Sequence, residues 1–332
     1  MSKLKALVLP SKTQLDNVCP ADVYDLINGY FDAEFNLTGA DYSVEEQDTL
    51  IGDAEVLLTT WGSPVLTAGG LAKAPKLKYV GHAAGTVKSR IPFEAFTRGV
   101  RVFSAAPRIA GSVADWCLAA IMTMLRRFPE FGNGLREGGQ WKGGVGSGME
   151  LTGMKLGIVS LSSTARALLP LLAPFRCDII AFDPYVSAEQ ADKLGVKLAP
   201  LEDVMARPVV SLHLPQLPAT KNMISKEQLA RIPDGGILIN SSRASVLDED
   251  ALIAELSSGR INAALDVYAT EPLPAESPLL KMPNILLTPH IAGATWQCYQ
   301  SLMRCVVENI INAIEGRPTQ YEVDPARWDI LA

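Results

Sequence analysis

Three residues in the last third of the chain could do chemistry together. They are Arg243 in INSSRASVLDEDAL, Glu271 in ALDVYATEPLP and His290 in LLTPHIAGAT, each close after a short apolar run. A guanidinium can hold a carboxylate and polarise a keto oxygen. A carboxylate beside an imidazole raises the pKa of the imidazole and keeps it protonated as a general acid near neutral pH. The set therefore suits the reduction of a 2-keto acid, although each residue alone could equally cap a strand, lie in a surface loop or pack in a core.

A second candidate site is the turn in LGIVSLSSTAR, residues 156–166, where an apolar run breaks into small residues and resumes as a helix. In a dinucleotide-binding unit three glycines form this turn and let the backbone approach the pyrophosphate. Ser160, Ser162 and Ala165 stand in those places here. The side chain of Ser162 would point into the space a phosphate needs, and a positive φ would cost a non-glycine residue about 1 kcal/mol. The residues alone also allow a plain strand-to-helix turn.

An acidic residue follows this turn at the spacing expected of a dinucleotide site. Asp183 ends CDIIAFD, some 20 residues downstream, where a carboxylate accepts hydrogen bonds from the adenosine ribose. An acid there repels a 2'-phosphate and so favours NAD over NADP. Asp-Pro-Tyr is also ordinary turn chemistry, so this residue too keeps a structural alternative.

The elements that must position these residues are short apolar runs with helical stretches between them. We expect strands near residues 5–10, 54–61, 77–83, 100–105, 155–161, 177–183, 209–215, 236–242, 261–267 and 284–290. Continuous rather than alternating apolar strands indicate parallel sheets covered on both faces, hence an α/β protein. We also expect a helix over 112–131 followed by a glycine-rich arm, and a helix over 306–317.

Composition excludes several other classes of protein. With 332 residues, 48% of them hydrophobic, the chain can form two domains. A net charge of -6 without a dense basic run predicts no nucleic-acid partner, and the longest apolar stretches predict no membrane span. With no signal peptide at the N-terminus, we expect a cytoplasmic protein. Five cysteines without a CxxC pair and three scattered histidines predict neither disulfides nor a metal site.

Taken in order, these motifs resemble the NAD-dependent D-isomer-specific 2-hydroxyacid dehydrogenase family, which includes the phosphoglycerate dehydrogenases. The segments that carry the resemblance are GHAAGTVKS, RVFSAAPRIAGSVADW, LTGMKLGIV, VVSLHLPQLPATKNMIS, LINSSRASVLDEDALIAEL, ALDVYATEPLP and TPHIAGAT. The resemblance implies two doubly wound parallel-sheet domains with the active site in the cleft between them. The flavodoxin-like substrate domain would comprise 1–106 and 297–332, and the Rossmann-type NAD-binding domain 107–296. It also implies a homodimer that pairs through the helix and arm at 112–150.

The resemblance assigns roles to individual residues. Arg243, Glu271 and His290 would be catalytic, and Ala84 and Gly85, with Arg243, would bind the substrate carboxylate. NAD would contact Ser162, Ser163, Thr164, Asp183, Leu212, His213, Pro215, Ser241, Ser242, Asp266, Ala292 and Gly293. His82 and the ring of His213 are expected to pack near the cleft. The chain departs from the family at SLSSTA, where the family has a sequence like GLGRIG, so serines replace two glycines and the basic residue that follows them.

Two functions follow from these observations. The first is an oxidoreductase that transfers a hydride between NAD(H) and a small D-2-hydroxy acid or 2-keto acid, with His290 as the proton donor. The alternative is a dehydrogenase-like binding or sensing protein with weakened or lost cofactor binding. Losing about 2 to 4 kcal/mol of pyrophosphate contacts at the serine turn would weaken affinity roughly 30- to 1000-fold. The sequence leaves open which acid is bound and whether the serines are natural or engineered.

Overall fold

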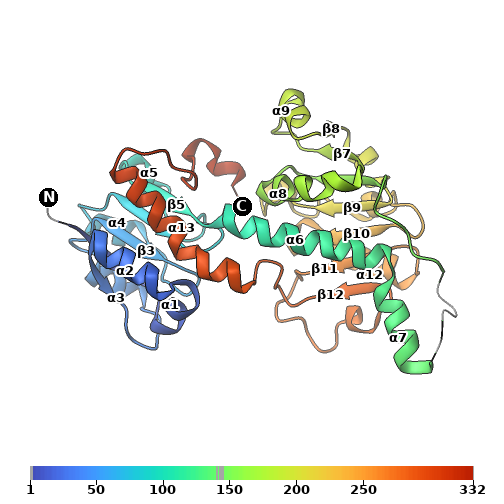
Figure 1. Cartoon of the computed structure of the whole chain (residues 1–332), viewed down its shortest axis with the longest axis horizontal. Coiled ribbons are helices and arrows are strands. Elements are labelled where there is room, and N and C mark those ends of the chain that lie inside the picture. Colours follow the sequence, from blue (N-terminus) through green and yellow to red (C-terminus); the bar gives the residue numbers. More distant parts are fainter. Residues whose placement is uncertain (1–2, 140, 142–145, 332) are drawn as a thin grey trace. The chain divides into compact units, whose positions relative to one another are not determined.

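The chain forms two separate α/β units. The computed structural model describes residues 3–139, 141 and 146–331. Unit 1 comprises Met1–Ile109 and Ala294–Ala332, and unit 2 comprises Ala110–Gly293. The sequence places these boundaries at 106/107 and 296/297. Figure 1 shows that each unit has its own sheet with helices on both faces, which is the predicted fold class.

Unit 1 is a five-stranded parallel sheet in the order β2-β1-β3-β4-β5. This 2-1-3-4-5 order is flavodoxin-like. Its elements are β1 (Leu4–Val8), α1 (Lys12–Val18), α2 (Ala21–Tyr30), β2 (Phe31–Phe35), α3 (Val44–Leu50), β3 (Val56–Thr59), α4 (Ala68–Lys73), β4 (Tyr79–His82), α5 (Glu94–Thr97), β5 (Arg101–Ser104), α13 (Trp296–Ile314) and the 3-10 helix η5 (Pro325–Ile330). One core cluster packs the sheet against α1, α2 and α13, and another fills its opposite face.

Unit 2 is a seven-stranded parallel sheet in the order β12-β11-β10-β9-β6-β7-β8. Its strands and helices are α7 (Phe128–Gly138), β6 (Lys155–Val159), α8 (Ser163–Leu172), β7 (Asp178–Phe182), α9 (Ala188–Lys193), β8 (Lys197–Leu198), α10 (Leu201–Met205), β9 (Val209–Leu212), α11 (Lys226–Leu229), β10 (Ile237–Asn240), α12 (Glu249–Ser257), β11 (Asn262–Leu265) and β12 (Ile285–Leu287). Short 3-10 helices lie at η1 (Ala173–Phe175), η2 (Pro218–Thr220), η3 (Ala244–Val246) and η4 (Pro278–Lys281). The chain order reverses between β6 and β9, and such a switch point is where open α/β sheets bind ligands.

Buried residues on successive strand positions alternate between the two faces of this sheet. Ile237 and Ile239 of β10 belong to the cluster under α6 (Ala106–Leu125) and α8, whereas Leu238 belongs to the cluster under α11 and α12. Gly157 in β6 lets α10 approach closely, because a Cβ there would lie 2.2 Å from the carbonyl oxygen of Val204. Both faces are thus covered, as continuous apolar strands require.

Some expected element boundaries are wrong. The helix expected over 112–131 is two helices, because α6 already begins at Ala106 and the left-handed Arg127 (φ 54°) separates it from α7. Ser112, which resembles an N-cap in the sequence, lies buried inside α6. The sequence also misses the edge strands β2 and β8, because β2 (FDAEF) alternates apolar and charged residues and β8 has only two residues. In the glycine-rich arm, residues 140 and 142–145 lie outside the described residues.

Helix α6 is long and apolar enough to cross a membrane by length and composition alone. Its buried residues, which include Ala114, Cys117 and Ile121, lie in the core cluster against the sheet of unit 2. The apolar length of this helix therefore has a packing explanation within the fold.

Candidate active site

The parallel strands of unit 2 bring the expected site residues to one edge of the sheet. Every strand runs in the same direction, so all the carboxyl ends meet at that edge. The residues that follow these ends are Ser162, Ser163 and Thr164 after β6, Asp183 after β7, His213 and Pro215 after Leu212 of β9, Ser241, Ser242 and Arg243 after β10, Asp266 and Glu271 after β11, and His290, Ala292 and Gly293 after β12.

Arg243, Glu271 and His290 line one cavity of about 670 Å³. The imidazole Nδ1 of His290 lies 2.7 Å from Oε2 of Glu271. An ionised carboxylate only accepts hydrogen bonds, so Nδ1 carries a proton. The other ring nitrogen, Nε2, is not used in this contact. The other oxygen of Glu271 accepts the backbone N–H of Tyr268 at 3.0 Å, which fixes the carboxylate in place.

The charges of this trio depend on one another. Burial raises the pKa of Glu271, but hydrogen bonds from His290 and the Tyr268 N–H, with the charges of His290 and Arg243, hold that pKa below its ordinary value. Burial lowers the pKa of Arg243, and the nearby charge of Glu271 works in the opposite direction. An arginine stays protonated in proteins, so the cavity contains a cation beside an ionised carboxylate.

His290 is held by a buried aspartate on the neighbouring strand end. Asp266 is 1% exposed, and its Oδ1 accepts Thr288 Oγ1 at 2.5 Å and the Ile291 N–H at 2.8 Å. Its Oδ2 accepts the Ala292 N–H at 2.8 Å. His290 lies between these anchors with a φ of 55°, an uncommon backbone conformation for a residue other than glycine. Asp266, expected from the resemblance to contact NAD, thus positions the segment that carries the histidine.

A polar residue at the end of β10 holds Arg243 in a similar way. Asn240, 1% exposed, donates to the carbonyl oxygen of Arg243 at 3.1 Å. Its side-chain oxygen accepts the N–H of Ser242 at 3.0 Å and the hydroxyl of Ser242 at 2.8 Å. Sequence analysis missed this residue, although an asparagine directly before two serines is a recognisable Asx-turn signal.

The serine turn after β6 keeps a glycine-like backbone at its first position. Ser160 has a φ of 74°, whereas Ser162 is extended, with φ -64° and ψ 177°. Sequence analysis expects the side chain of Ser162 to interfere with a phosphate, but the residue with the positive φ is Ser160. Asp183 stabilises it, because its Oδ2 accepts the Leu161 N–H at 2.8 Å and Ser160 Oγ at 3.3 Å. Oδ1 of Asp183 accepts the Tyr185 N–H at 2.9 Å.

The remaining expected contacts of unit 2 differ in burial: Leu212, His213 and Ala292 are buried, whereas Pro215, Ser241, Ser242 and Gly293 are partly exposed. Cys117 Sγ lies 3.1 Å from Ser241 Oγ, so the serine packs against α6. His213 is 3% exposed with Nε2 2.9 Å from Ser211 Oγ, and its Nδ1 is buried without a hydrogen-bond partner among the described residues. Burial lowers the pKa of His213 to about 4, so the ring is neutral at physiological pH.

In unit 1, the loop after β4 presents backbone N–H groups. Ser104 Oγ donates to the carbonyl oxygen of Gly85 at 2.7 Å and lies 3.4 Å from that of Ala84. The N–H groups of Ala84 and Gly85 meet no acceptor in the described part of the chain, so they suit an anion such as a carboxylate. Ser104 was not identified from the sequence. His82 beside this loop is 2% exposed and bonds Thr59 Oγ1 at 2.8 Å.

Comparison with known proteins identifies the family. The NAD-binding domain model of the D-isomer specific 2-hydroxyacid dehydrogenases matches residues 118–292. The D-3-phosphoglycerate dehydrogenase of Mycobacterium tuberculosis is 36% identical over 269 residues, which are 80% of this chain and 50% of that protein. The glyoxylate/hydroxypyruvate reductase B of Yersinia enterocolitica is 32% identical over 325 residues, 92% of this chain and 95% of that protein.

The chain belongs to the D-isomer specific 2-hydroxyacid dehydrogenase family. A phosphoglycerate oxidoreductase from Rhizobium etli has a similar structure, with a TM-score of 0.82, 27% identity and coverage of 97% of this chain and 99% of that one. The chain spans about half the length of the D-3-phosphoglycerate dehydrogenases it matches. The family resemblance and the fold class expected from the sequence are thus confirmed, and the residues that match the NAD-binding domain model, 118–292, all lie in unit 2.

The start of α8 fits the diphosphate of NAD. In the described residues, the N–H groups of Ser163, Thr164 and Ala165 have no acceptor, and the side chain of Ser162 makes no capping hydrogen bond. Unpaired N–H groups at a helix N-terminus bind phosphate oxygens and carry the positive end of the helix dipole. This dehydrogenase-family turn therefore keeps its backbone donors despite the serines. Among the described residues no group of three or more His, Cys, Asp or Glu side chains could hold a metal ion.

Proposed function

We propose that the chain is an NAD-dependent oxidoreductase that interconverts a small D-2-hydroxy acid and its 2-keto acid. NADH supplies the hydride when bound. Arg243 holds the substrate carboxylate and polarises the keto oxygen, while His290 protonates that oxygen from Nε2. Glu271 accepts from Nδ1, which fixes the ring orientation and stabilises the protonated imidazole.

One observation carries this proposal: the 2.7 Å contact between His290 Nδ1 and Glu271 Oε2 in the cavity that Arg243 also lines. An acid, its orienting carboxylate and an anion-binding cation are all that the protein itself must supply for this reaction. His290 adopts its positive φ between three anchors on Asp266, and uncommon backbone conformations cluster at functional sites. Relatives named D-3-phosphoglycerate dehydrogenase and glyoxylate reductase act on acids of this class and support the proposal.

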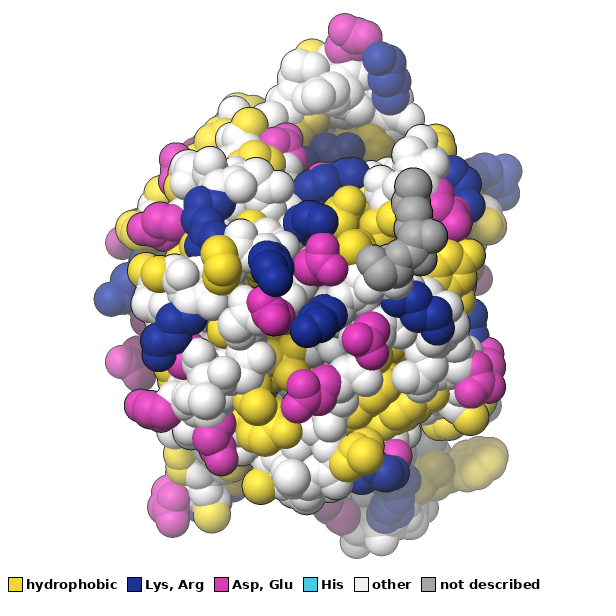
Figure 2. Space-filling view, turned by 90° about the vertical axis from the view of Figure 1, so that its left-hand side faces the viewer, with side chains coloured by type: hydrophobic (Ala, Val, Ile, Leu, Met, Phe, Trp, Pro, Cys, Tyr) yellow, Lys and Arg dark blue, Asp and Glu magenta, His cyan; other side chains and the backbone are white. Residues whose placement is uncertain are grey.

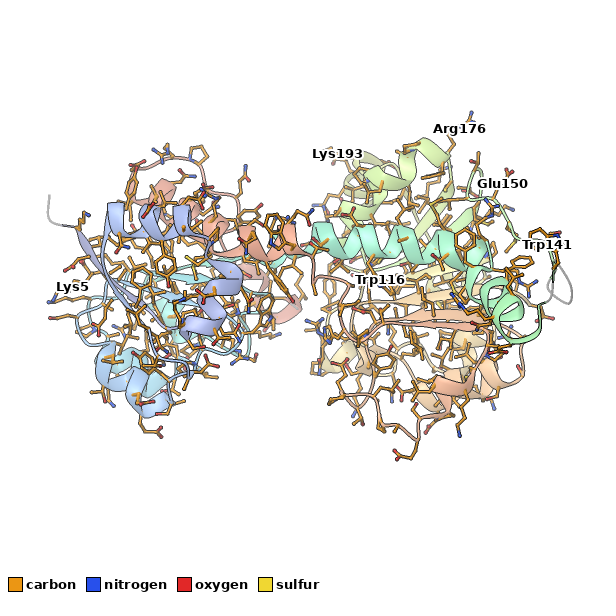
Figure 3. The ribbon with its side chains drawn as sticks, turned by 60° about the horizontal axis from the view of Figure 1, so that its bottom comes forward. Lys5, Trp116, Trp141, Glu150, Arg176 and Lys193 are labelled. Carbon is orange, nitrogen blue, oxygen red and sulfur yellow. The ribbon has the colours of Figure 1, made fainter. Side chains whose placement is uncertain are left out.

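The experiment is NADH oxidation by the purified chain with a panel of 2-keto acids. We expect His290→Ala and Arg243→Ala each to lower kcat/KM for the best substrate by about 10²- to 10⁴-fold. Arg176→Gln is a matched control, because Arg176 is exposed and lies outside the cavity (Figure 3). Turnover that is unchanged in both cavity variants would contradict the catalytic assignment.

The alternative, a binding or sensing protein with weakened cofactor affinity, is tested by titrating NADH into the chain and into Ser160→Gly/Ser162→Gly. Micromolar binding by the unaltered chain would support the dehydrogenase, because the free N–H groups at α8 would then suffice. Binding only after glycine is restored would favour the alternative.

We also propose that the chain forms a homodimer through α6, α7 and the arm that follows them. Met122, Phe128, Leu135 and Met149 are exposed, and Trp141 is 79% exposed. Figure 3 shows Trp141 beyond the end of α7. Apolar side chains of this size are costly to leave in water, and a second copy would cover them. Light scattering should give the mass of a dimer, and Phe128→Glu/Leu135→Glu should give a monomer; a monomeric parent would contradict this proposal.

The remaining partner proposals rest on charge and cysteine chemistry. Basic and acidic side chains are interspersed on the face shown in Figure 2, which favours a small acid over nucleic acid as the ligand. The packing of α6 in a core favours a protein without a membrane partner. No disulfide joins cysteines in the described residues, which supports a cytoplasmic location.

A further inference from the structure

The start of α8 offers a dinucleotide only part of the charge that its diphosphate needs. The diphosphate carries two negative charges, whereas a helix N-terminus contributes about half a positive charge. Ser162, Ser163 and Thr164 are uncharged, and Asp183 places a carboxylate on the other side of the turn. A cation close to this turn would therefore strengthen the binding of the diphosphate.

Arg166 is placed to be that cation. It lies in the second turn of α8, and helical side chains lean toward the N-terminus of their helix. Its Nε donates to the carbonyl oxygen of Leu161 at 2.8 Å. Asp183 holds the N–H of the same residue at 2.8 Å, so both backbone groups of Leu161 are tied to charged side chains. The guanidinium thus has a fixed position beside the turn.

The rest of the guanidinium is available for a ligand. Arg166 is exposed, and no hydrogen bond or ion pair joins its two terminal nitrogens to any described residue. A guanidinium anchored through Nε keeps two parallel N–H donors, the arrangement that binds phosphate oxygens in pairs. Its side-chain entropy is already reduced by the Leu161 contact, which lowers the cost of binding an anion.

No other basic residue of this segment competes for the role. Between residues 155 and 185 the only other lysine or arginine residues are Lys155 and Arg176. Lys155 begins β6, at the opposite edge of the sheet, and Arg176 follows η1 beyond the far end of α8. The segment after β9, residues 213–220, contains no lysine or arginine, and its His213 is neutral because burial lowers its pKa to about 4.

We propose that Arg166 binds the diphosphate of the dinucleotide cofactor through its terminal nitrogens, so that a side chain supplies the charge the serine turn lacks. This inference rests on the proposed function, because it assumes that the chain uses NAD(H). It adds a side-chain contact, from a residue about one helical turn inside α8, to the backbone N–H groups at the start of that helix.

The test is the affinity of the full chain for three ligands: NADH, ADP-ribose, which contains the diphosphate, and adenosine, which does not. Arg166→Gln should raise the Kd for NADH and ADP-ribose roughly tenfold, the loss expected for one charge-assisted contact. Arg166→Lys should lose less. Arg176→Gln, an exposed arginine at the other end of the helix, should bind all three ligands like the parent.

Two further readouts separate phosphate binding from a purely structural role. The affinity for adenosine should be the same in Arg166→Gln as in the parent. That result would show that the part of the site that binds adenosine is intact. The Kd of the parent for NADH should rise with salt more steeply than that of Arg166→Gln, because salt screens the charge that the variant lacks. Equal NADH affinity in parent and Arg166→Gln would overturn the assignment while leaving the dehydrogenase function standing. A parent that binds no NADH would overturn both.

Discussion

Two turns at the carboxyl edge of unit 2 are built in the same way. After β6, Ser160 has a φ of 74°, and Asp183 from the neighbouring strand β7 holds the turn. After β12, His290 has a φ of 55°, and Asp266 from the neighbouring strand β11 holds the segment. In both, an aspartate after one strand accepts at least one backbone N–H from the segment after the strand paired with it. In both, a residue other than glycine adopts a left-handed conformation.

The turns differ in how deeply the aspartate is buried and in how many hydrogen bonds it accepts from the turn. Asp266 is 1% exposed and binds three donors on the His290 segment. Asp183 is half-buried and binds two donors on the serine turn, one of them at 3.3 Å. Asp266 therefore fixes the segment that carries His290, the side chain proposed to donate the proton. The β6 turn needs only to present backbone donors and depends less on its aspartate.

The largest effect is expected at Asp266. Asp266→Ala leaves Thr288 Oγ1 and the Ile291 and Ala292 N–H groups unsatisfied, which should lower the free energy of unfolding by about 3 to 5 kcal/mol. The displacement of His290 should lower kcat/KM by about 10²-fold. Urea unfolding and steady-state kinetics measure both effects. Unchanged kinetics in a variant that still folds would show that the aspartate does not aim the histidine.

Acid should weaken both units through a buried histidine in each. Burial, with a smaller contribution from Arg90, lowers the pKa of His82 in unit 1 to about 4, as burial does for His213 in unit 2. The unfolded chain therefore binds a proton at each imidazole below about pH 6.5 that the folded chain binds only near pH 4. The free energy of unfolding should fall between those values by up to about 3 kcal/mol for each histidine.

Urea unfolding at several pH values checks this prediction. The loss should be shallower in His82→Asn, whose side chain does not titrate. A stability that is flat from pH 7 to 4 would contradict the prediction, and turn variants are best compared above pH 7, where these histidines do not contribute.

A smaller effect is expected at Asp183. Asp183→Asn keeps a side-chain oxygen but loses the charge that holds the Leu161 N–H and Ser160 Oγ, so we expect about 1 to 2 kcal/mol of destabilisation. The preference for NAD over NADP should also relax, because the carboxylate that repels a 2'-phosphate is gone. Kd values for NADH and NADPH measure this preference. An unchanged ratio would leave Asp183 as a turn residue only.

The smallest effect separates backbone conformation from hydrogen bonding at Ser160. Ser160→Ala keeps the unfavourable φ and loses the contact with Asp183, whereas Ser160→Gly also relieves the conformation. The glycine variant should be more stable than the alanine variant by about 1 kcal/mol in urea unfolding. Equal stability of the two variants would show that the left-handed conformation at position 160 costs a non-glycine residue no free energy.

Residue type and spacing were enough to predict the α/β class, the parallel sheets and the identity of Arg243, Glu271 and His290 as candidates. Continuous apolar strands require burial on both faces, and parallel strands require their ends to meet at one edge. Edge strands β2 and β8 escaped prediction because β2 has no continuous apolar run, since its apolar and charged residues alternate, and because β8 has only two residues. The start of α6 at Ala106 escaped it because Ser112 imitates a helix start in the sequence, and the division between α6 and α7 escaped it because it depends on the left-handed conformation of Arg127.

Only the tertiary structure decided how the two turns are held. The sequence shows an aspartate after β7 and another after β11, but not which donors they bind, since those donors come from neighbouring strands and depend on pairing register. It likewise shows the serines of the β6 turn, but not that Ser160 takes the left-handed conformation or that Arg166 reaches back to Leu161. Amino-acid type sets which hydrogen bonds are possible, and the packing of distant strands and helices selects the ones that form.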